Sequence, residues 1–398
     1  MKHQLTVVPP PALARAGQDT SPVVRDSLAL AARPGILSFS GGFPAPELFD
    51  VEGLRASFDH VLRTAGPRAL QYSATEGDPA LRAAIAGRLA GQGFTADPER
   101  IVITTGAQQG LALLAGELLG PGDTVLVENP TYVSALQSFA AVRARVVPVA
   151  TDERGIVLDA LADAVRRERP TAIYLVPNFQ NPAGHTLPAA RRAAVAELAA
   201  VHGLWIVEDD PYAELRFDGG ERLPRISGFA AVHDRSVLVG SLSKLLAPGL
   251  RLGWLHAPAP VVRAVALAKQ AADMHSSTVD QAAAAHYLAT HDLDAHLAAV
   301  RRSYRERAEA MLGGLAAALP EGSRWSRPEG GMFIWVRLPP GHDAVALLPR
   351  AVDAGVAYVP GAPFYVGAPE PETLRLSFTT NQPDAIRTGM RRLATIFR

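Results

Sequence analysis

The fold is organised around the stretch Ser241-Leu242-Ser243-Lys244-Leu245-Leu246-Ala247-Pro248-Gly249-Leu250-Arg251. It follows an apolar run, residues 236–240, that is typical of a buried strand. We therefore expect Lys244 at a strand end, facing inward, where burial and a neighbouring cation such as Arg251 lower its pKa. A neutral amine is what Schiff-base chemistry requires.

The neighbours of Lys244 favour a cofactor site. A lone lysine after a strand is a solvated surface residue in most proteins. Here, however, Ser241 and Ser243 precede it, Arg251 follows it, and no acidic residue lies among them. An amine beside a phosphate-binding cluster suggests pyridoxal 5′-phosphate (PLP), because its aldehyde reacts with a lysine and its phosphate binds serines and an arginine.

Composition excludes several other classes of protein. A chain of 398 residues with 48% hydrophobic content can bury a large core, and its length predicts two or three domains. The 39 basic and 39 acidic residues balance, so there is no electrostatic signature of a partner nucleic acid or anionic membrane. Because the chain has no cysteine, disulfides, thiol catalysis and thiolate metal sites are excluded.

The first residues predict neither a signal peptide nor a membrane anchor. Residues 1–8 carry one lysine and a very short apolar run before three prolines. No uninterrupted apolar run approaches the length of a membrane span. We expect a cytoplasmic protein in which residues 1–36 form an arm with a short helix over 23–32.

Strands alternate with helices from about residue 100 to 260. Short β-branched runs occupy 101–105, 124–128, 145–149, 171–176, 204–208 and 236–239. Helical stretches such as 188–202 separate several of them. This alternation predicts an α/β fold with a mainly parallel central sheet and helices on both faces. Ligands of such sheets bind at the carboxyl ends of the strands.

The turns after these strands carry the candidate ligands. Gly106 opens a helix whose free N–H groups could cradle an anion, although such turns are usually structural. Tyr132 either packs in the core or stacks on a flat ring. Asn181, held extended by the proline after it, can point its amide at a ligand. Asp209 ends a hydrophobic strand and needs a partner such as a pyridinium nitrogen, whereas Asp210 is as readily a solvated loop acid.

A smaller domain is expected to follow. Beyond residue 260 the pattern predicts helices at 259–290, 293–318 and 383–396, and strands at 330–336, 356–359 and 374–378. We assign residues 51–290 to a large domain, and residues 37–50 with 291–398 to a small α+β domain.

Two features of the small domain are candidates for substrate binding. Arg375 alternates with apolar neighbours on its strand, so it suits a carboxylate if its face lines a cleft; an arginine facing solvent is the commoner case. The pair Gly41-Gly42 either turns the chain or lets the backbone approach a ligand closely.

In this order, the turns resemble those of the fold-type I PLP-dependent aminotransferases of class I/II, from about residue 21 to the end. The resemblance is closest to the 2-aminoadipate and kynurenine aminotransferase II branch. The motifs that carry it are FSGGFPAPELF at 39–49, LQYS at 70–73 and TGAQQG at 105–110. It implies a three-layer fold, transamination between an L-amino acid and a 2-oxo acid (2-oxoglutarate or pyruvate), and a homodimer with shared active sites.

The resemblance also implies residue roles. Lys244 would carry PLP as a Schiff base and move the substrate proton, Asp209 would pair with the pyridine nitrogen, and Tyr132 would stack on the ring. Asn181 and Tyr212 would hydrogen-bond the ring oxygen. The phosphate would be held by Gly106, Ala107, Gln108, Ser241, Ser243 and Arg251, together with Tyr72 from a second subunit. The substrate would be bound by Arg375 at its α-carboxylate, by Asn181, and by Gly41, Gly42 and Arg25 around its side chain.

The sequence departs from the family pattern at two positions. Ala107 stands where many relatives have a serine or threonine, so a hydroxyl contact is lost. Pro22 stands where a serine assists the arm arginine, which leaves specificity for acidic substrates open.

Other enzymatic reactions, and a class of transcription regulators, use the same fold. A racemase, a β-lyase and a decarboxylase all use the same lysine, so its motif does not separate them from an aminotransferase. Regulators that contain this unit carry a winged-helix domain ahead of it, for which we expect too few residues before Gly41.

Overall fold

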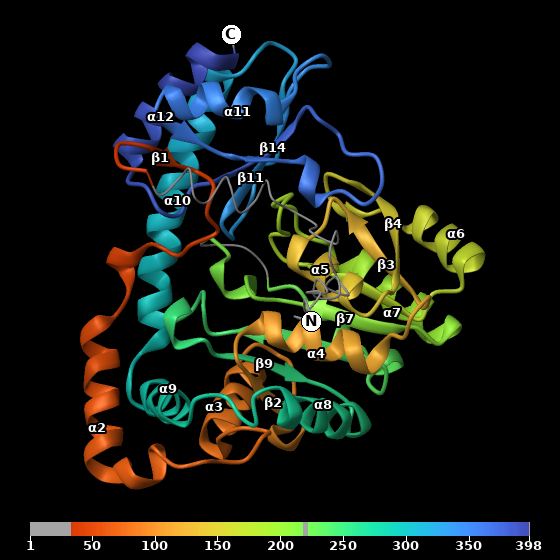
Figure 1. Cartoon of the computed structure of the whole chain (residues 1–398), viewed down its shortest axis with the longest axis vertical. Coiled ribbons are helices and arrows are strands. Elements are labelled where there is room, and N and C mark those ends of the chain that lie inside the picture. Colours follow the sequence, from red (N-terminus) through yellow and green to blue (C-terminus); the bar gives the residue numbers. More distant parts are fainter. Residues whose placement is uncertain (1–32, 218–221, 398) are drawn as a thin grey trace, which may run out of the picture.

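An eight-stranded sheet forms the centre of the computed structural model, which describes residues 33–217 and 222–397 (Figure 1). Its strands are β2 (Ile101–Thr104), β3 (Thr124–Asn129), β4 (Arg145–Asp152), β5 (Gly155–Ile156), β6 (Ala172–Leu175), β7 (Trp205–Asp209), β8 (Ser236–Ser241) and β9 (Gly253–His256). They lie in the order β2-β9-β8-β7-β6-β3-β4-β5. The predicted helix at 23–32 lies outside the described residues.

The centre of this sheet is parallel, as predicted. β8, β7, β6, β3 and β4 pair in parallel, whereas β2, β9 and β5 pair antiparallel to their neighbours. Strand β9 was not predicted: it enters between β2 and β8, directly after the Lys244 segment. Its residues include Gly253 and Trp254, so it lacks the uniform β-branched run that marked the other strands.

Strands β3, β6, β7 and β8 are buried on both faces, which explains their nearly continuous apolar sequences. In β3, Val125 and Val127 belong to one hydrophobic core and Leu126 belongs to a second one on the other side. In β6, Tyr174 lies in the first core, whereas Ile173 and Leu175 lie in the second. This alternation places helices on both faces of the sheet and confirms the three-layer α/β fold.

The helices flanking this sheet are α2 (Val51–Ala69), α3 (Pro79–Ala90), α4 (Ala107–Leu118), α5 (Val133–Ala141), α6 (Leu158–Glu168), α7 (Ala189–His202), α8 (Ala259–Ala272) and α9 (Thr278–Thr290). Helix α7 ends as predicted, because Gly203 adopts the left-handed conformation at its C-terminus (φ 72°).

The single helix predicted at 259–290 is wrong. The structure has two helices, α8 and α9, separated by residues 273–277. Met274 takes a positive φ of 65°, which ends α8, and the Ser277 side chain accepts a hydrogen bond from Asp280 N to cap α9. Alanine-rich sequence on both sides hid this break.

Two smaller sheets are formed by the segments near the two ends of the described chain. Antiparallel strands β10 (Arg324–Trp325), β11 (Phe333–Arg337), β14 (Thr373–Ser377) and β13 (Val359–Pro360) form one sheet in this order. Strands β1 (Leu37–Ser38) and β12 (Val356–Ala357) pair in parallel. The predicted strand at 356–359 is therefore two short strands in different sheets. The helices of this part are α10 (Leu293–Ala318), α11 (Ala344–Asp353) and α12 (Pro383–Phe397).

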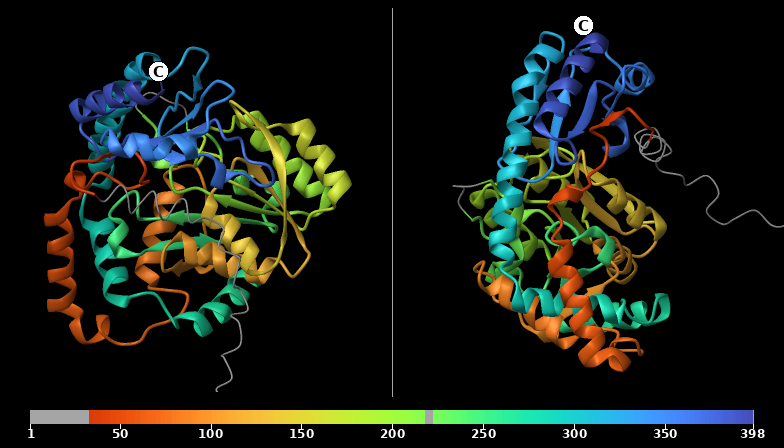
Figure 2. Two further views of the ribbon diagram at one scale, coloured as in Figure 1. Left: turned by 45° about the horizontal axis from the view of Figure 1, so that its top comes forward. Right: turned by 90° about the vertical axis from the view of Figure 1, so that its left-hand side faces the viewer.

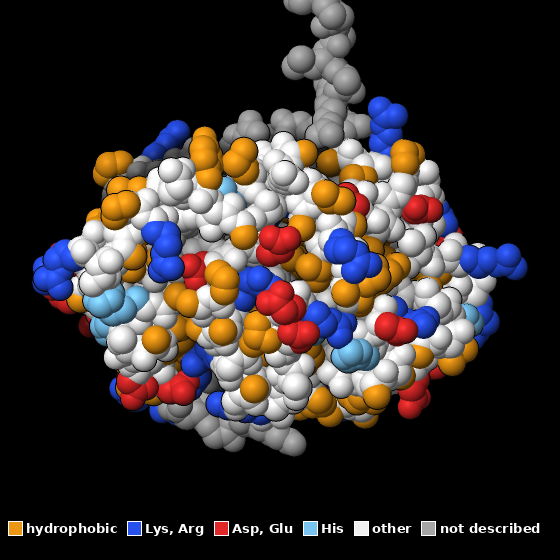
Figure 3. All heavy atoms as spheres, turned by 90° about the horizontal axis from the view of Figure 1, so that it is seen from below, with side chains coloured by type: hydrophobic (Ala, Val, Ile, Leu, Met, Phe, Trp, Pro, Cys, Tyr) orange, Lys and Arg blue, Asp and Glu red, His pale blue; other side chains and the backbone are white. Residues whose placement is uncertain are grey.

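Helix α10 connects the two parts of the molecule. It runs along one side of the molecule from the four-stranded sheet to the neighbourhood of α9 (Figure 1), and the side view in Figure 2 shows its full length. Basic and acidic side chains are interspersed on the face shown in Figure 3. None of the described helices is both long and apolar enough to cross a membrane.

Candidate active site

The carboxyl ends of the parallel strands open into a cavity of about 550 Å³. Asp209 ends β7, Lys244 follows β8, and Asn181 follows β6. Arg375, from β14 of the four-stranded sheet, closes the other side. The remaining predicted residues that line the cavity are Gly42, Ala107, Gln108, Tyr132, Tyr212, Ser241, Ser243 and Arg251. The structure thus brings together side chains that are far apart in the sequence.

Lys244 is held at the floor of this cavity. Its Nζ donates a hydrogen bond of 2.9 Å to the carbonyl oxygen of Gly42. Burial, together with the positive charges of Arg375 and Arg251, lowers the pKa of Lys244 to about 8. The expected inward-facing lysine is therefore present, and about a tenth of its amine is neutral at pH 7, far more than for an unperturbed lysine.

Asp209 presents one unused carboxylate oxygen. Its Oδ2 accepts a hydrogen bond of 2.7 Å from the hydroxyl of Tyr174, whereas its buried Oδ1 has no hydrogen-bond partner. Burial raises the pKa of Asp209 to about 7; the hydrogen bond from Tyr174 opposes this shift and the charge of Asp210 adds to it. A buried acceptor without a partner is costly, so this oxygen marks a place where a donor can bind.

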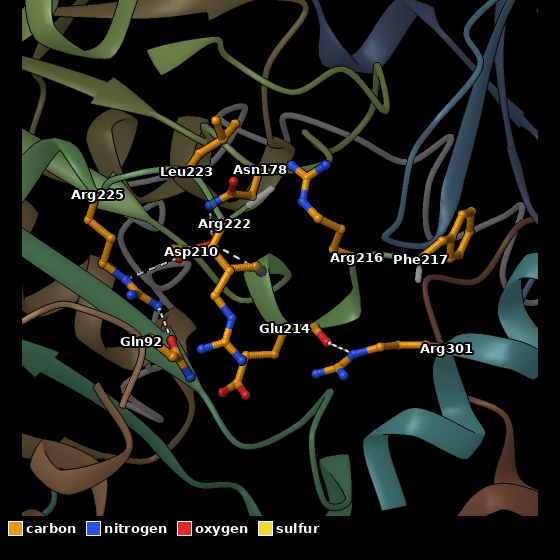
Figure 4. Close-up of a pocket in the computed structure, with 11 residues that line it drawn as sticks. Gln92, Asn178, Asp210, Glu214, Arg216, Phe217, Arg222, Leu223, Arg225 and Arg301 are labelled. Atoms are coloured by element: carbon orange, nitrogen blue, oxygen red, sulfur yellow. Dashed lines mark hydrogen bonds and ion pairs between the residues drawn. The ribbon is translucent and has the colours of Figure 1, made fainter. Parts of the chain in front are cut away.

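Asp210 points away from the cavity. Its Oδ1 accepts hydrogen bonds from Asn178 Nδ2 (2.8 Å) and Ala213 N (3.1 Å), and its Oδ2 lies 3.4 Å from Arg225 Nε. Figure 4 shows these groups around a separate pocket of about 190 Å³. The two neighbouring acids therefore have different environments, and only Asp209 lines the active-site cavity.

Arg375 is buried and already oriented. Its Nη1 donates to Asn181 Oδ1 and its Nη2 to the carbonyl oxygen of Ser40, both at 2.7 Å. The guanidinium also lies over the rings of Phe333 (4.3 Å) and Phe364 (5.1 Å). Burial lowers the pKa of Arg375 to about 10, so it remains a cation at neutral pH, and its Nε is left without an acceptor. Arg375 therefore faces the cavity and not the solvent.

The residues predicted to bind an anion come together where α4 begins. Gly106 takes a φ of 81°, and a Cβ there would lie 2.4 Å from Arg251 Nη2. Only glycine allows the arginine to approach the backbone this closely. Ser241 and Ser243 lie on the same side, where Ser241 Oγ accepts a hydrogen bond of 3.1 Å from Ser243 N.

Three predicted residues within the described part of the chain do not line the cavity: Gly41, Gly106 and Tyr72. Gly41 lies next to it, and a Cβ there would overlap the ring of Phe43. Tyr72 is 76% exposed and packs edge-on against His275, with ring centroids 5.8 Å apart. Arg25 lies outside the described residues.

Sequence reasoning missed other residues of the site. Tyr174 was read only as part of a strand, although a buried tyrosine needs a partner for its hydroxyl and this was a usable signal. Phe333 and Phe364 gave no such signal, because aromatic residues on strands and turns usually serve packing alone.

Comparison with known proteins gives a consistent result. Residues 50–393 match the family described as aminotransferase class I and II. The chain is 42% identical to a 2-aminoadipate transaminase of Thermus thermophilus over 380 residues, which are 95% of this chain and 94% of the relative. It is 37% identical to aromatic-amino-acid aminotransferase 1 of Thermococcus litoralis, with 93% of this chain and 90% of the relative covered.

Solved structures of aminotransferases are also similar to this chain. The crystal structure of an alpha-aminoadipate aminotransferase from Thermus thermophilus, complexed with N-(5′-phosphopyridoxyl)-L-leucine, superimposes with a TM-score of 0.88 at 40% identity. The match covers 95% of this chain and 94% of that one.

Proposed function

Because the chain belongs to the class I and II aminotransferases and uses PLP, we propose that it moves the amino group of an L-amino acid to 2-oxoglutarate or pyruvate in two half-reactions. The observation that carries the proposal is one cavity that holds Lys244, the unpartnered Oδ1 of Asp209, and Arg375. These are an amine, a buried acceptor and a carboxylate-binding cation.

The residues present fit PLP. The unpartnered Oδ1 of Asp209 suits a protonated pyridine nitrogen. The Gly106 turn against Arg251 suits a phosphate. We assign Tyr132 to stacking on the ring, and Asn181 and Tyr212 to its oxygen. The phosphate is assigned to Gly106, Ala107, Gln108, Ser241, Ser243 and Arg251, with Tyr72 of a second copy.

Bound PLP supplies a carbonyl carbon that condenses with amines and an electron-poor ring that stabilises negative charge at the substrate Cα. Lys244 does the proton transfer. In its neutral form, Nζ would accept the proton from the substrate Cα and would later donate it to the carbon that was the aldehyde carbon of PLP, so that the amino group stays with the cofactor. The pKa of about 8 keeps this base near the working pH.

Arg375 orients the substrate. Its guanidinium is fixed by Asn181 and Ser40, so little freedom is lost when it binds the α-carboxylate. This grip determines which bond at Cα faces Lys244 and so favours proton removal over decarboxylation.

The cavity wall favours amino donors with apolar side chains. Among the described lining residues the cations are Lys244, Arg251 and Arg375, and each has a role already. The wall around Arg375 also includes Phe333, Phe364, Phe43, Val133 and Val359. We assign Arg25, in the arm, to the second carboxylate of 2-oxoglutarate.

The same proposal includes the domains. The cavity is lined from both residues 51–290 and residues 37–50 with 291–398, which supports a large and a small domain with the site between them. Residues 1–36 are the arm, and the protein is assigned to the cytoplasm.

The proposal also includes a homodimer. Leu70 and Tyr72 are 72% and 76% exposed, as expected for side chains that a second copy covers.

A single-turnover experiment tests the proposed function. Mixing the PLP form with an apolar L-amino acid should yield the 2-oxo acid and pyridoxamine phosphate in equal amounts, with loss of the cofactor's visible absorbance. Lys244→Ala should reduce this rate by about 10³-fold or more. A racemised or decarboxylated product without pyridoxamine phosphate, or wild-type turnover by Lys244→Ala, would contradict the proposal.

A further inference from the structure

A partly buried ion pair lies beside the turn that opens α4, with the Lys269 side chain fully covered and the Asp273 side chain 26% exposed. Lys269 and Asp273 are one turn apart at the end of α8, with Lys269 Nζ 2.7 and 2.9 Å from the two carboxylate oxygens. Only three of the 39 lysine and arginine residues are lysines (Lys2, Lys244 and Lys269), so arginine supplies nearly every positively charged side chain. Because an ion pair that takes its lysine out of water contributes little net stability, its presence calls for another role.

Both members of the ion pair hold the side chain of Gln109. Lys269 Nζ donates to Gln109 Oε1 (3.0 Å), and Gln109 Nε2 donates to Asp273 Oδ2 (2.7 Å). The two bonds fix which way the amide faces. Its Oε1 also accepts a hydrogen bond of 2.7 Å from the backbone N–H of Thr105. The ion pair is thereby connected to the turn that opens α4.

The hydroxyl of Thr105 makes further contacts, in addition to the hydrogen bond of its backbone N–H. Its Oγ1 donates to Asp273 Oδ2 at 2.9 Å and lies 3.1 Å from Ser276 Oγ. These contacts depend on the break between α8 and α9, because the break places Asp273 and Ser276 beside Thr105. The backbone and the side chain of Thr105 are therefore both fixed before Gly106.

The result resembles half of a capping box. In the full motif, the cap side chain binds an N–H of the first turn and a glutamine three residues later reaches back. Here the cap residue, Gly106, has no side chain, and Gln109 reaches back past it to the N–H of Thr105, one residue before the cap. The N–H groups of Ala107, Gln108 and Gln109 have no acceptor within the helix and remain available to an anion.

We propose that Gln109, Lys269 and Asp273 form a phosphate-loop brace, which holds residues 105–107 in the shape that binds the phosphate of PLP. The inference rests on the proposed assignment of that phosphate to Gly106, Ala107 and Arg251. The three brace residues do not line the cavity. They are positioning residues, and they act on cofactor affinity through Thr105 and the first turn of α4.

Comparing PLP with pyridoxal, which lacks the phosphate, tests the brace. Cofactor-free protein is titrated with each compound, and binding is followed by the absorbance of the bound ring. For Gln109→Met and Lys269→Met we expect affinity for PLP to fall about tenfold and affinity for pyridoxal to change less than about twofold. Arg305→Met removes an exposed ion pair with the same spacing (Arg305–Glu309), so this control should leave both affinities unchanged.

Two results would overturn the brace. One is wild-type affinity for PLP in both variants. The other is an equal loss for PLP and pyridoxal, which indicates damage to the fold or to the ring site. Gln109→Met is the safer variant if Lys269→Met does not fold, because Gln109 is only partly buried.

Arg251→Gln separates the brace from the phosphate assignment on which it rests. If this variant loses the preference for PLP over pyridoxal but Gln109→Met and Lys269→Met retain it, the phosphate site stands and the brace is wrong. If Arg251→Gln retains the preference, the phosphate assignment is wrong and the brace is wrong with it.

Discussion

Tyr174 donates a 2.7 Å hydrogen bond to Oδ2 of Asp209 and leaves Oδ1 of the same carboxylate buried without a partner. The two residues lie on the adjacent parallel strands β6 and β7, so the sheet itself sets their distance. Tyr174 fixes the orientation of the carboxylate, and the free oxygen is directed to the place where PLP is proposed to bind.

Asp209→Asn should stabilise the cofactor-free protein at high pH. The pKa of Asp209 is raised to about 7 by burial, above its unfolded value, so the native state binds this proton more tightly. Its contribution to the free energy of unfolding is therefore full below about pH 4 and is lost as pH rises toward 7, by at most about 4 kcal/mol. Urea denaturation from pH 5 to 8 should show the advantage of the variant growing with pH. A difference that does not change with pH would contradict the assignment.

Arg375→Leu should impair reactions of amino acids and spare those of simple amines. Removing a charge-assisted grip on the α-carboxylate should lower kcat/KM for amino acids by about 10²- to 10³-fold. A primary amine without a carboxylate does not use this grip, so its slow single-turnover rate should change little. Equal losses for both substrates would show that Arg375 acts on the fold or on the cofactor instead.

Gly42→Ala should select against bulky amino donors. A Cβ at this position would lie 2.8 Å from Phe333 Cζ, and Phe333 is buried and unable to move freely. We expect kcat/KM for phenylalanine to fall about tenfold or more relative to alanine. Gly41→Ala is the matched comparison, because its new Cβ meets the exposed ring of Phe43, which can turn away. If both variants have the same selectivity, Gly42 does not shape the side-chain pocket.

Mixed dimers should show whether Tyr72 serves the other subunit. At limiting PLP, Lys244→Ala and Tyr72→Ala proteins should each be weakly active. After the subunits are exchanged, half of the dimers are hybrids, and each hybrid has one site with both residues intact. We therefore expect recovery of about a quarter of the wild-type activity. No recovery, although mass spectrometry shows hybrids, would place Tyr72 in the site of its own subunit.

Local sequence patterns were sufficient to predict which residues after the strands belong to the candidate site. Lys244, Asp209, Asn181 and Gly106 were predicted from apolar runs that end in polar or glycine residues, because parallel strands bring their carboxyl ends to one edge of the sheet. The same local signals gave the α/β class and the end of α7 at Gly203.

Three other features of the site depend on the tertiary structure and could not be predicted from local sequence. The direction of Arg375, the hydrogen bond from Tyr174, and the brace at Gln109 all depend on partners between 35 and 335 residues away. Strand β9 and the break after α8 were missed because their local signals are weak: β9 contains Gly253 and Trp254, and alanine-rich sequence surrounds the break at residues 273–277. The sequence names the reacting groups, and the order of strands in the sheet determines which of them meet.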